Sequence, residues 1–368
     1  MAEPWLDADA RGRIETPAIV VDLDRVERNI DRMATAMGDR GVALRPHAKT
    51  HKSLEFGRRQ LAAGASGLTV ATVGEGEVFA AGGFDDLFVA YPVIASGRRA
   101  ERLRDLGERC ALSVGVDSAF GAGTIAAAVH GAARQPRVLV EINCGGRRTG
   151  VRPEDAGALA RHCRALGLVV IGVFTHGGHG YAGHDARPGA AADEVSGLTV
   201  AAAALRAEGI EPMVVSAGST PTAVLSASGA VTEERPGTYI FSDRQQAILA
   251  GESVDGVALV VAATVISHGT ETGFIIDAGA KILGKDVAPY LAGHGEVLDW
   301  GGASVARIYD HHGVVELAAG AERPAIGTIV WVAPNHVCPV VNLVNEYLVA
   351  RGGHLVDRWP VDARGRNG

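Results

Sequence analysis

Lysine is scarce in this chain, and one lysine stands where covalent amine chemistry would be expected. The chain has four lysines, at positions Lys49, Lys52, Lys281 and Lys285, and its other basic residues are arginines. Lys49 follows a predicted strand and has His47 and His51 close by in the sequence. Neighbouring positive charge lowers a lysine pKa, and the neutral amine then forms a Schiff base with an aldehyde. Lys49 is therefore a candidate anchor for pyridoxal phosphate (PLP), and a solvated basic turn is the structural alternative.

A turn rich in glycine and hydroxyl side chains could hold the phosphate of such a cofactor. Residues 216–222 read SAGSTPT and follow a predicted strand. Backbone N–H groups at a helix start bind phosphate well, and Pro221 suits the first turn of a helix. We expect Ser219 and Thr220 to contact the phosphate, although an isolated turn of this composition is more often only a loop.

His336 and Cys338 form a candidate metal pair in the segment PNHVC, at the end of a predicted strand. In an extended segment, residues two apart face the same way, so both side chains could reach one ion. Imidazole and thiolate together suit zinc. Two protein ligands would leave coordination positions for water and substrate, but an isolated pair of this kind usually binds nothing.

Hydrophobic periodicity predicts the frame that positions these residues. The predicted strands are Ala18–Val21, Val42–Arg45, Gly67–Ala71, Leu87–Ala90, Leu112–Val116, Val138–Ile142, Val169–Phe174 and Met213–Val215. The predicted helices are Leu23–Met37, Ser53–Ala63, Gly74–Ala81, Gly97–Leu106, Ser118–His130, Pro153–Leu166, Ala190–Glu208 and Pro221–Ser228. Eight alternations favour an α/β fold with an N-terminal (β/α)8 barrel over a doubly wound open sheet. Barrel active sites lie at the carboxyl ends of strands, which is where Lys49 falls.

Beyond Arg244 the pattern changes to strands with little helix between them. These predicted strands are Val257–Ser267, Gly273–Asp277, Ser304–Tyr309, Gly313–Leu317, Ile326–Ala333 and Glu346–Ala350. We therefore predict a barrel over residues 16–244 and a mostly β domain over residues 245–368, joined by residues 1–15. The β domain carries the candidate metal pair.

The composition of the chain disfavours several classes of binding partner. The net charge of −7 disfavours a general binder of nucleic acid or anionic membranes. The most apolar run, Val257–Ile266, is too short to span a bilayer, and the N-terminus does not read as a secretory signal. Four scattered cysteines without a CxxC pair indicate a reduced, cytoplasmic protein rather than a disulfide scaffold.

Two segments carry a family resemblance. TPAIVVDLDRVERNI and RPHAKTHK resemble the start of the D-threonine aldolase and D-serine dehydratase family, and the similarity runs from Thr16 through nearly the whole chain. It implies the alanine racemase-like fold of PLP enzymes (fold type III), a barrel followed by a β domain, and a homodimer. By this resemblance Lys49, and not Lys52, binds PLP, and Lys49 and His336 are catalytic.

The same resemblance implies further site residues. It places Arg148 near the phenolic oxygen of PLP and His176 against the ring face. It assigns Gly237, Thr238 and Tyr239, in the segment RPGTY, to the phosphate, and it lets Tyr181 face the substrate. It also makes His336 and Cys338 ligands of a divalent metal, with zinc expected first and manganese or magnesium as alternatives.

The implied activity is a PLP- and metal-dependent lyase that acts on D-3-hydroxy amino acids. We favour D-threonine aldolase-type cleavage to glycine and an aldehyde. The alternative is a D-serine or D-threonine dehydratase, which forms a 2-oxo acid and ammonia. An amino-acid racemase would share the fold and the lysine but leave the metal pair unexplained. A PLP carrier without activity and a phosphate-binding barrel without PLP are further alternatives.

Overall fold

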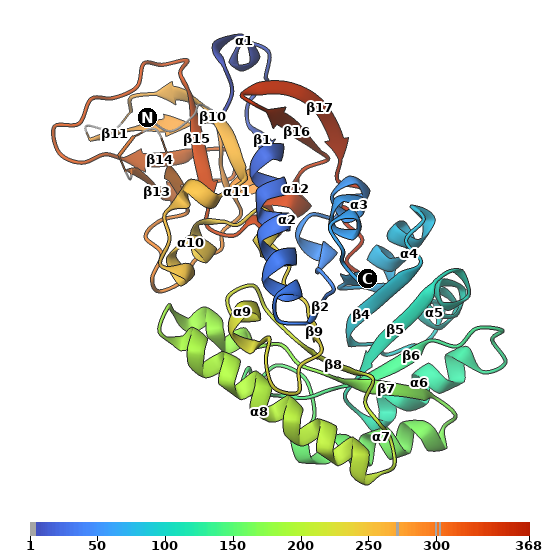
Figure 1. Cartoon of the computed structure of the whole chain (residues 1–368). Coiled ribbons are helices and arrows are strands. Elements are labelled where there is room, and N and C mark those ends of the chain that lie inside the picture. The colour runs from blue at the N-terminus through green and yellow to red at the C-terminus, as the bar shows by residue number, and fades with distance from the viewer. Residues whose placement is uncertain (1–4, 270–271, 299, 302) are drawn as a thin grey trace. The chain divides into compact units, whose positions relative to one another are not determined.

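The structure is a computed structural model that describes residues 5–269, 272–298, 300–301 and 303–368 (Figure 1). The chain divides into two compact units. Unit 1 comprises Met1–Ile30, Thr50–Ser53 and Thr238–Arg364, and unit 2 comprises Asp31–Lys49, Leu54–Gly237 and Gly365–Gly368. Residues 1–4, part of the predicted N-terminal piece of the β domain, lie outside the described residues. The domain boundary predicted at residues 244–245 stays a prediction.

Unit 2 is built on an eight-stranded parallel sheet. Its strands are β2 (Ala43–Leu44), β3 (Leu68–Val70), β4 (Asp86–Pro92), β5 (Ala111–Val116), β6 (Arg137–Glu141), β7 (Val169–Phe174), β8 (Val214–Ala217) and β9 (Glu233–Glu234). Consecutive strands are neighbours from β3 to β9, and β9 then pairs with β2. A parallel bridge between His47 and Thr69 links the two ends of the sheet. This arrangement confirms the predicted (β/α)8 barrel.

Helices connect the strands of this barrel. They are α3 (Leu54–Ala62), α4 (Val73–Ala81), α5 (Arg98–Arg109), α6 (Ala119–Val129), α7 (Ala156–Ala165), α8 (Ala186–Ala207) and α9 (Ala223–Ser226), with the short 3-10 turns η1 (Ala48–Thr50), η2 (Pro153–Asp155) and η3 (Gly178–Ala182). Figure 1 shows α5 to α8 on the outer side of the strands. Hydroxyl side chains cap the N-termini of two of these helices. Thr72 accepts from the Glu75 N–H at the start of α4, and Ser118 accepts from the Gly121 N–H at the start of α6.

The core of the barrel is apolar, as its sequence pattern requires. Strands such as β5 and β6 are buried along nearly their whole length, which is typical of parallel strands covered on both faces. Phe88 and Phe174 meet edge to face with ring centroids 5.0 Å apart, and they pack with Leu139 and Ile171. This apolar cluster includes Phe174, the last residue of β7.

Two predictions about the barrel strands are wrong. Ala18–Val21 forms a strand (β1, Ala18–Asp22), but that strand pairs with two strands of unit 1 and not with the barrel. The barrel is instead closed by Glu233–Glu234, which shows no apolar run. A hydrophobic period predicts that a segment is extended, but it does not identify the neighbouring strand, which backbone pairing decides in three dimensions.

Unit 1 contains a nine-stranded sheet in the order β11-β14-β13-β12-β15-β10-β1-β16-β17, with a further pairing of β10 with β11. Its other strands are β10 (Leu259–Ser267), β11 (Gly273–Ile276), β12 (Gly295–Val297), β13 (Ala303–Ile308), β14 (Gly313–Glu316), β15 (Ile329–Pro334), β16 (Glu346–Arg351) and β17 (His354–Pro360). The sequence pattern predicts neither β12, which is only three residues long, nor β17, which is largely exposed. The mostly β character of this part of the chain is confirmed.

Short helices accompany this sheet, more than the pattern predicts. They are α1 (Ala8–Arg11), α10 (Arg244–Ala250), α11 (Ala280–Leu283) and α12 (Val337–Leu343), with the 3-10 turns η4 (Thr238–Ile240) and η5 (Val254–Gly256). The longer α2 (Leu23–Gly38) begins in unit 1 and ends in unit 2. None of the helices in the described ranges is long and apolar enough to cross a membrane.

Candidate active site

Lys49 lies in a cavity of about 390 Å3 at the carboxyl ends of the barrel strands. The cavity is lined by residues that end or follow seven of the eight strands, namely His47, Lys49, Ala71, Thr72, Ala90, Tyr91, Pro92, Arg148, Thr149, Phe174, His176, Gly218 and Arg235, and also by Asn367. The structure thus brings together Lys49, Arg148 and His176, which the sequence predicts as site residues. Lys52 is not among these lining residues, since it belongs to unit 1 and its Nζ donates to Asn342 Oδ1 at 2.8 Å.

The charge of this cavity favours an anion. Lys49, Arg148 and Arg235 supply cationic groups, and none of the lining residues in the described part of the chain carries a carboxylate. A cleft lined by one sign of charge raises the local concentration of ligands of the opposite sign. A molecule with phosphate or carboxylate groups is therefore the ligand that this cavity attracts.

His176 is held as a neutral imidazole in the wall of the cavity. Its Nδ1 lies 3.1 Å from the Gly218 carbonyl oxygen. Because a carbonyl only accepts, Nδ1 carries the proton and Nε2 does not. Burial lowers the pKa of His176 to about 3, and the charges of Lys49 and Arg148 act in the same direction. The ring is thus uncharged at neutral pH and suited to packing against a flat conjugated ligand.

Tyr181 and Arg148 line a second cavity of about 320 Å3, which shares Arg148, Thr149 and His176 with the first. The Tyr181 and His176 rings have centroids 6.4 Å apart. The Arg148 side chain is 60% exposed and reaches Glu141 Oε1 only at 4.0 Å, so it is free to turn toward a bound ligand. Arg147 is exposed as well and has a positive φ of 50°.

The candidate phosphate turn follows β8, but its local structure differs from the prediction. The helix after it, α9, has only four residues and begins at Ala223, so Pro221 lies in the preceding turn and not inside the helix. The Ser219 hydroxyl lies 2.9 Å from that of Thr222. Gly218 lines the Lys49 cavity, whereas Ser219 and Thr220 are not among its lining residues. The turn thus presents its backbone at Gly218 to the cavity.

Gly218 must be glycine in this turn. Its φ is +119°, and a Cβ atom there would lie 2.4 Å from Glu234 Oε2 and 2.7 Å from the Arg235 nitrogen. Ala217 ends the regular strand β8, so the alanine at that position requires no unusual backbone conformation.

Glu194 on α8 is a residue that sequence reasoning missed. It is fully buried, and its Oε1 accepts from the Gly177 N–H at 2.8 Å and from the Gly218 N–H at 3.0 Å. One carboxylate therefore ties the loop after β7, which carries His176, to the loop after β8. Burial raises the pKa of Glu194, while these N–H donors and Thr222 oppose that rise. A glutamate within an alanine-rich helical period gives no sequence signal for this role.

Replacing Glu194 should loosen both loops. We expect Glu194→Ala to lower the free energy of unfolding by about 2–5 kcal/mol, because two buried N–H groups lose their acceptor. Glu194→Gln keeps one acceptor oxygen and should cost about half as much. Urea denaturation of each variant measures the difference. The neighbouring exposed residue Asp193, which pairs with His179, is the control, and Asp193→Ala should change stability by less than about 1 kcal/mol. Equal losses for Asp193→Ala and Glu194→Ala would contradict this assignment.

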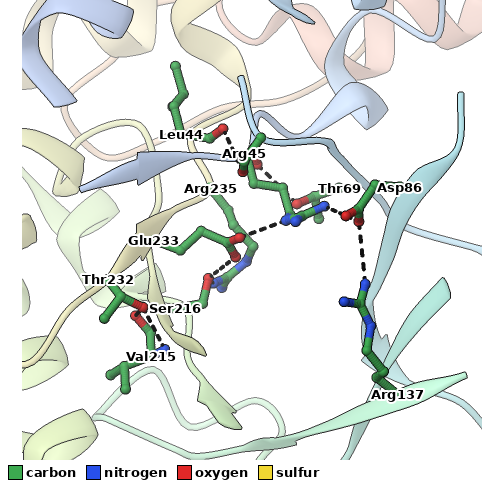
Figure 2. Close-up of polar contacts among 11 residues, drawn as sticks. Leu44, Arg45, Thr69, Asp86, Arg137, Val215, Ser216, Thr232, Glu233 and Arg235 are labelled. Atoms are coloured by element: carbon green, nitrogen blue, oxygen red, sulfur yellow. Dashed lines mark hydrogen bonds and ion pairs between the residues drawn. The ribbon is translucent and has the colours of Figure 1, made fainter. Parts of the chain in front are cut away.

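A chain of polar contacts links Arg45 to Arg235, which lines the cavity. Figure 2 shows Arg45 between Asp86 and Glu233, with N···O distances of 2.8 and 2.7 Å. Ser216 donates to Glu233 at 2.6 Å and receives a bond from Arg235. Arg235 also donates to the Thr175 carbonyl and stacks with its Cζ 5.3 Å from the Phe174 ring centroid.

These contacts hold the buried Arg235 guanidinium in one orientation at the cavity wall. Sequence reasoning named only the segment that contains Arg235. Gly237 is the last residue of that stretch of unit 2, whereas Thr238 and Tyr239 are buried residues of unit 1.

The candidate metal pair lies in unit 1, and the prediction that it stands on an extended segment is wrong. β15 ends at Pro334, His336 is the residue before α12, and Cys338 is the second residue of that helix. The two side chains nevertheless interact with each other. The Cys338 sulfur lies 3.3 Å from the Thr50 hydroxyl and 3.9 Å from that of Thr238.

Asp286 and Asp243 surround this pair with negative charge. Asp286 Oδ2 lies 2.6 Å from His336 Nδ1, which leaves Nε2 as the nitrogen available to a ligand. The buried Asp243 accepts from the Gln246 and Val337 N–H groups and so holds the start of α12 in place. Burial alone would lower the pKa of His336, but Cys338, Asp286 and Asp243 raise it to about 11. The site therefore stabilises positive charge at His336.

Within the described ranges, no group of three or more His, Cys, Asp or Glu side chains is arranged to hold a metal ion. His336 and Cys338 would therefore be the two protein ligands of an ion whose other positions are open. Asp286 supplies the carboxylate that commonly orients a metal-binding histidine through its other nitrogen. The residues fit a divalent ion of the zinc type, since imidazole and thiolate are its usual ligands.

Two family models match separate parts of the chain. Residues 21–245 match the alanine racemase N-terminal domain, and residues 258–350 match the putative serine dehydratase domain. The fold and the cavity thus define an enzyme of the alanine racemase-like class.

Two curated relatives resemble nearly the whole chain. D-threo-3-hydroxyaspartate dehydratase of Delftia sp. (strain HT23) is 38% identical over 369 residues, which cover 94% of this chain and 97% of that protein. D-threonine aldolase of Arthrobacter sp. is 34% identical over 373 residues, covering 98% and 96%. The crystal structure of D-threonine aldolase from Filomicrobium marinum superposes with a TM-score of 0.87 at 32% identity, covering 96% of each chain. The chain belongs to the family that contains these aldolases and dehydratases, which are lyases.

Two variants of a D-threo-3-hydroxyaspartate dehydratase have also been solved. One is a cysteine-to-alanine variant in the metal-free form, and the other is a histidine-to-alanine variant. The two substituted positions are two residues apart in that protein, which is also the spacing of His336 and Cys338 in this chain.

Proposed function

We propose that this protein is a PLP- and divalent metal-dependent lyase that cleaves D-3-hydroxy amino acids to glycine and an aldehyde. The observation that carries the proposal is the position of Lys49, one of only four lysines, in a cation-lined cavity at the carboxyl ends of the barrel strands. Membership of a family of lyases with these two domains supports it.

The cavity residues fit PLP. Lys49 would hold the cofactor covalently, and the neutral His176 ring would pack against its flat face. Arg148 would face the phenolic oxygen, and the backbone at Gly218 would take the phosphate within the cavity. The phosphate contacts of Ser219, Thr220 and Gly237–Tyr239 rest on the family resemblance alone. When bound, PLP supplies a conjugated ring that stores the electrons released at the substrate Cα.

A metal ion at His336 and Cys338 would supply a Lewis acid for the substrate hydroxyl group. The fit rests on the donor set and on Asp286, which orients the imidazole from its other side. The bound species is proposed to be zinc, with manganese or magnesium as alternatives.

Lys49, His176 and Tyr181 are proposed to have three different roles. Lys49 Nζ, which lines the cavity, would be the group that holds or moves a proton at the substrate Cα. The Nδ1–H of His176 stays on the Gly218 carbonyl, so this ring holds its position and does not exchange protons at neutral pH. Tyr181, in the adjoining cavity, is proposed to contact the substrate side chain.

Dehydration to a 2-oxo acid and ammonia is the second candidate, and one observation favours it. The variants solved for a D-threo-3-hydroxyaspartate dehydratase replace a histidine and a cysteine at the same spacing as His336 and Cys338, and the cysteine variant is in the metal-free form. A thiolate ligand also selects softer ions than a carboxylate does. Both reactions use the same substrates and the same residues, so their products must be measured separately.

The decisive test uses the purified chain with PLP and zinc, manganese or magnesium. D-threonine and 3-hydroxy-D-aspartate are supplied, and aldehyde is assayed separately from 2-oxo acid and ammonia. Aldehyde with glycine supports cleavage, and 2-oxo acid with ammonia supports dehydration. If neither product forms with any of the three ions, the proposal is refuted. Racemisation of alanine without metal would instead support a racemase.

Asp286 gives a separate prediction for the metal pair. We expect Asp286→Asn to weaken metal affinity by about 10–100-fold, because the carboxylate that orients His336 is replaced by a neutral amide. Competition with a chelator of known affinity measures the change. Asp310→Asn is the matched control, since this carboxylate is 71% exposed and lies 4.0 Å from the Lys281 amine. An unchanged affinity in Asp286→Asn would show that the carboxylate has no part in the site.

A further inference from the structure

The chain returns to unit 2 after its long passage through unit 1. Residues Gly365–Gly368 belong to unit 2, and Figure 1 shows this end of the chain beside β4 and α4. The Thr72 hydroxyl donates to the Arg366 carbonyl at 2.6 Å. The Gly74 N–H and Arg102 Nη2 both donate to the backbone oxygen of Gly368 at 3.1 Å. The segment 365–368 is thus bonded to the start of α4, where helix N–H groups lack partners within the helix.

The absence of a side chain at Gly74 allows the segment 365–368 to approach the backbone of α4 closely. A Cβ atom at Gly74 would lie 2.6 Å from the Gly368 oxygen and 3.3 Å from the Arg366 oxygen. Contacts below 3 Å to backbone oxygen require the segment to move. A side chain at position 74 would therefore displace the segment 365–368 from its place at the start of α4.

Asn367 lies between these anchoring points and lines the Lys49 cavity. It shares that wall with Lys49, Arg148, Tyr91 and Thr72. An asparagine amide both donates and accepts hydrogen bonds and carries no charge. Among cationic neighbours, its NH2 group adds a directed donor for an anionic oxygen without adding to the charge repulsion.

We propose that residues 365–368 form one wall of the Lys49 cavity and that Asn367 is a positioning residue for the molecule bound there. The inference rests on the proposed function, because it assigns Asn367 to the same cavity. Its partner is an anionic oxygen, which either the cofactor or the carboxylate of the amino acid can supply.

Two substitutions in the full chain test the assignment. Asn367→Ala removes the donor, and Asn367→Asp replaces it with a negative charge. PLP is titrated into the apoenzyme by its absorption, and the KM and kcat for D-threonine are measured with saturating PLP and metal. We expect Asn367→Ala to raise the PLP Kd or the KM about tenfold, and Asn367→Asp to raise it further. A change in PLP Kd assigns the oxygen to the cofactor, and a change in KM alone assigns it to the substrate. Values equal to those of the parent chain in both assays overturn the proposal.

Gly74→Ala tests the wall itself, since it displaces the segment without altering a cavity residue. It should shift the same constant as Asn367→Ala, whereas Gly123→Ala, in α6 with no atom within 4 Å of the added Cβ, should not. Thermal unfolding confirms that each variant folds.

Hydrogen exchange at Gly74 in the ligand-free chain provides a test without activity, and an unprotected amide there overturns the docking. A parent chain without a lysine-dependent PLP band refutes the proposed function, whereas a normal band with unaffected Asn367 variants refutes only this inference.

Discussion

Lys49→Ala is expected to abolish the absorption of lysine-bound PLP and to lower lyase activity by about 1000-fold or more. Among the described residues that line the cavity, Lys49 alone has an amine that can bind an aldehyde covalently, and removing a covalent residue costs far more than removing a binding contact. Because the residue is only partly buried, the variant should fold normally. The measurement is the absorption spectrum of the purified protein with PLP, followed by the product assays.

The small number of lysines makes it possible to compare Lys49 with other lysines of the chain. Lys281→Ala removes a lysine whose side chain is 63% exposed, and it should leave both the spectrum and the activity unchanged. Lys52 is buried in unit 1, so Lys52→Arg, which keeps the charge, is the better substitution there. Retention of the PLP band in Lys49→Ala, with its loss in either of the other variants, would move the cofactor to a different lysine and contradict the proposed site.

The second large effect is expected at the metal pair. Cys338→Ala and His336→Ala should each reduce bound metal from about one ion per chain to near zero, because two ligands are few and neither alone holds the ion. Activity should fall by more than about 100-fold, beyond the loss expected for an orienting residue such as Asp286. Metal analysis and product assays on the same samples give both numbers.

Removing the metal from the parent chain with a chelator provides a comparison for these two variants. Treating the parent chain with a chelator should reproduce the loss seen in Cys338→Ala, and added zinc should restore only the parent chain. Cys163→Ala is the cysteine control, since burial raises the pKa of that thiol to about 11 and makes it a poor ligand. Full metal content and activity in Cys338→Ala would remove the metal from the proposed mechanism.

The sequence by itself determined the elements of the barrel and several of its site residues. The alternation of apolar runs and helical periods predicts seven of the eight barrel strands, because each strand is buried on both faces and must be apolar. Rarity and position single out Lys49, and the structure places Lys49, Arg148 and His176 around one cavity. Their common location follows from a local rule, since all three come after barrel strands and parallel strands end at one face.

Only the tertiary structure decided which segments pair and which buried groups support the site. β1 pairs within the sheet of unit 1 and not with the barrel, and the strand Glu233–Glu234 pairs with β2 in its place. Strand pairing depends on backbone neighbours in three dimensions, which no local sequence pattern records. Glu194 and Asp286 reach their partners from 24 and 50 residues away in the sequence, and Asn367 lines the same cavity as Lys49, which is 318 residues away. Hydrogen bonds and cavity walls between such distant residues exist only after folding, so their chemistry is invisible in the spacing of the chain.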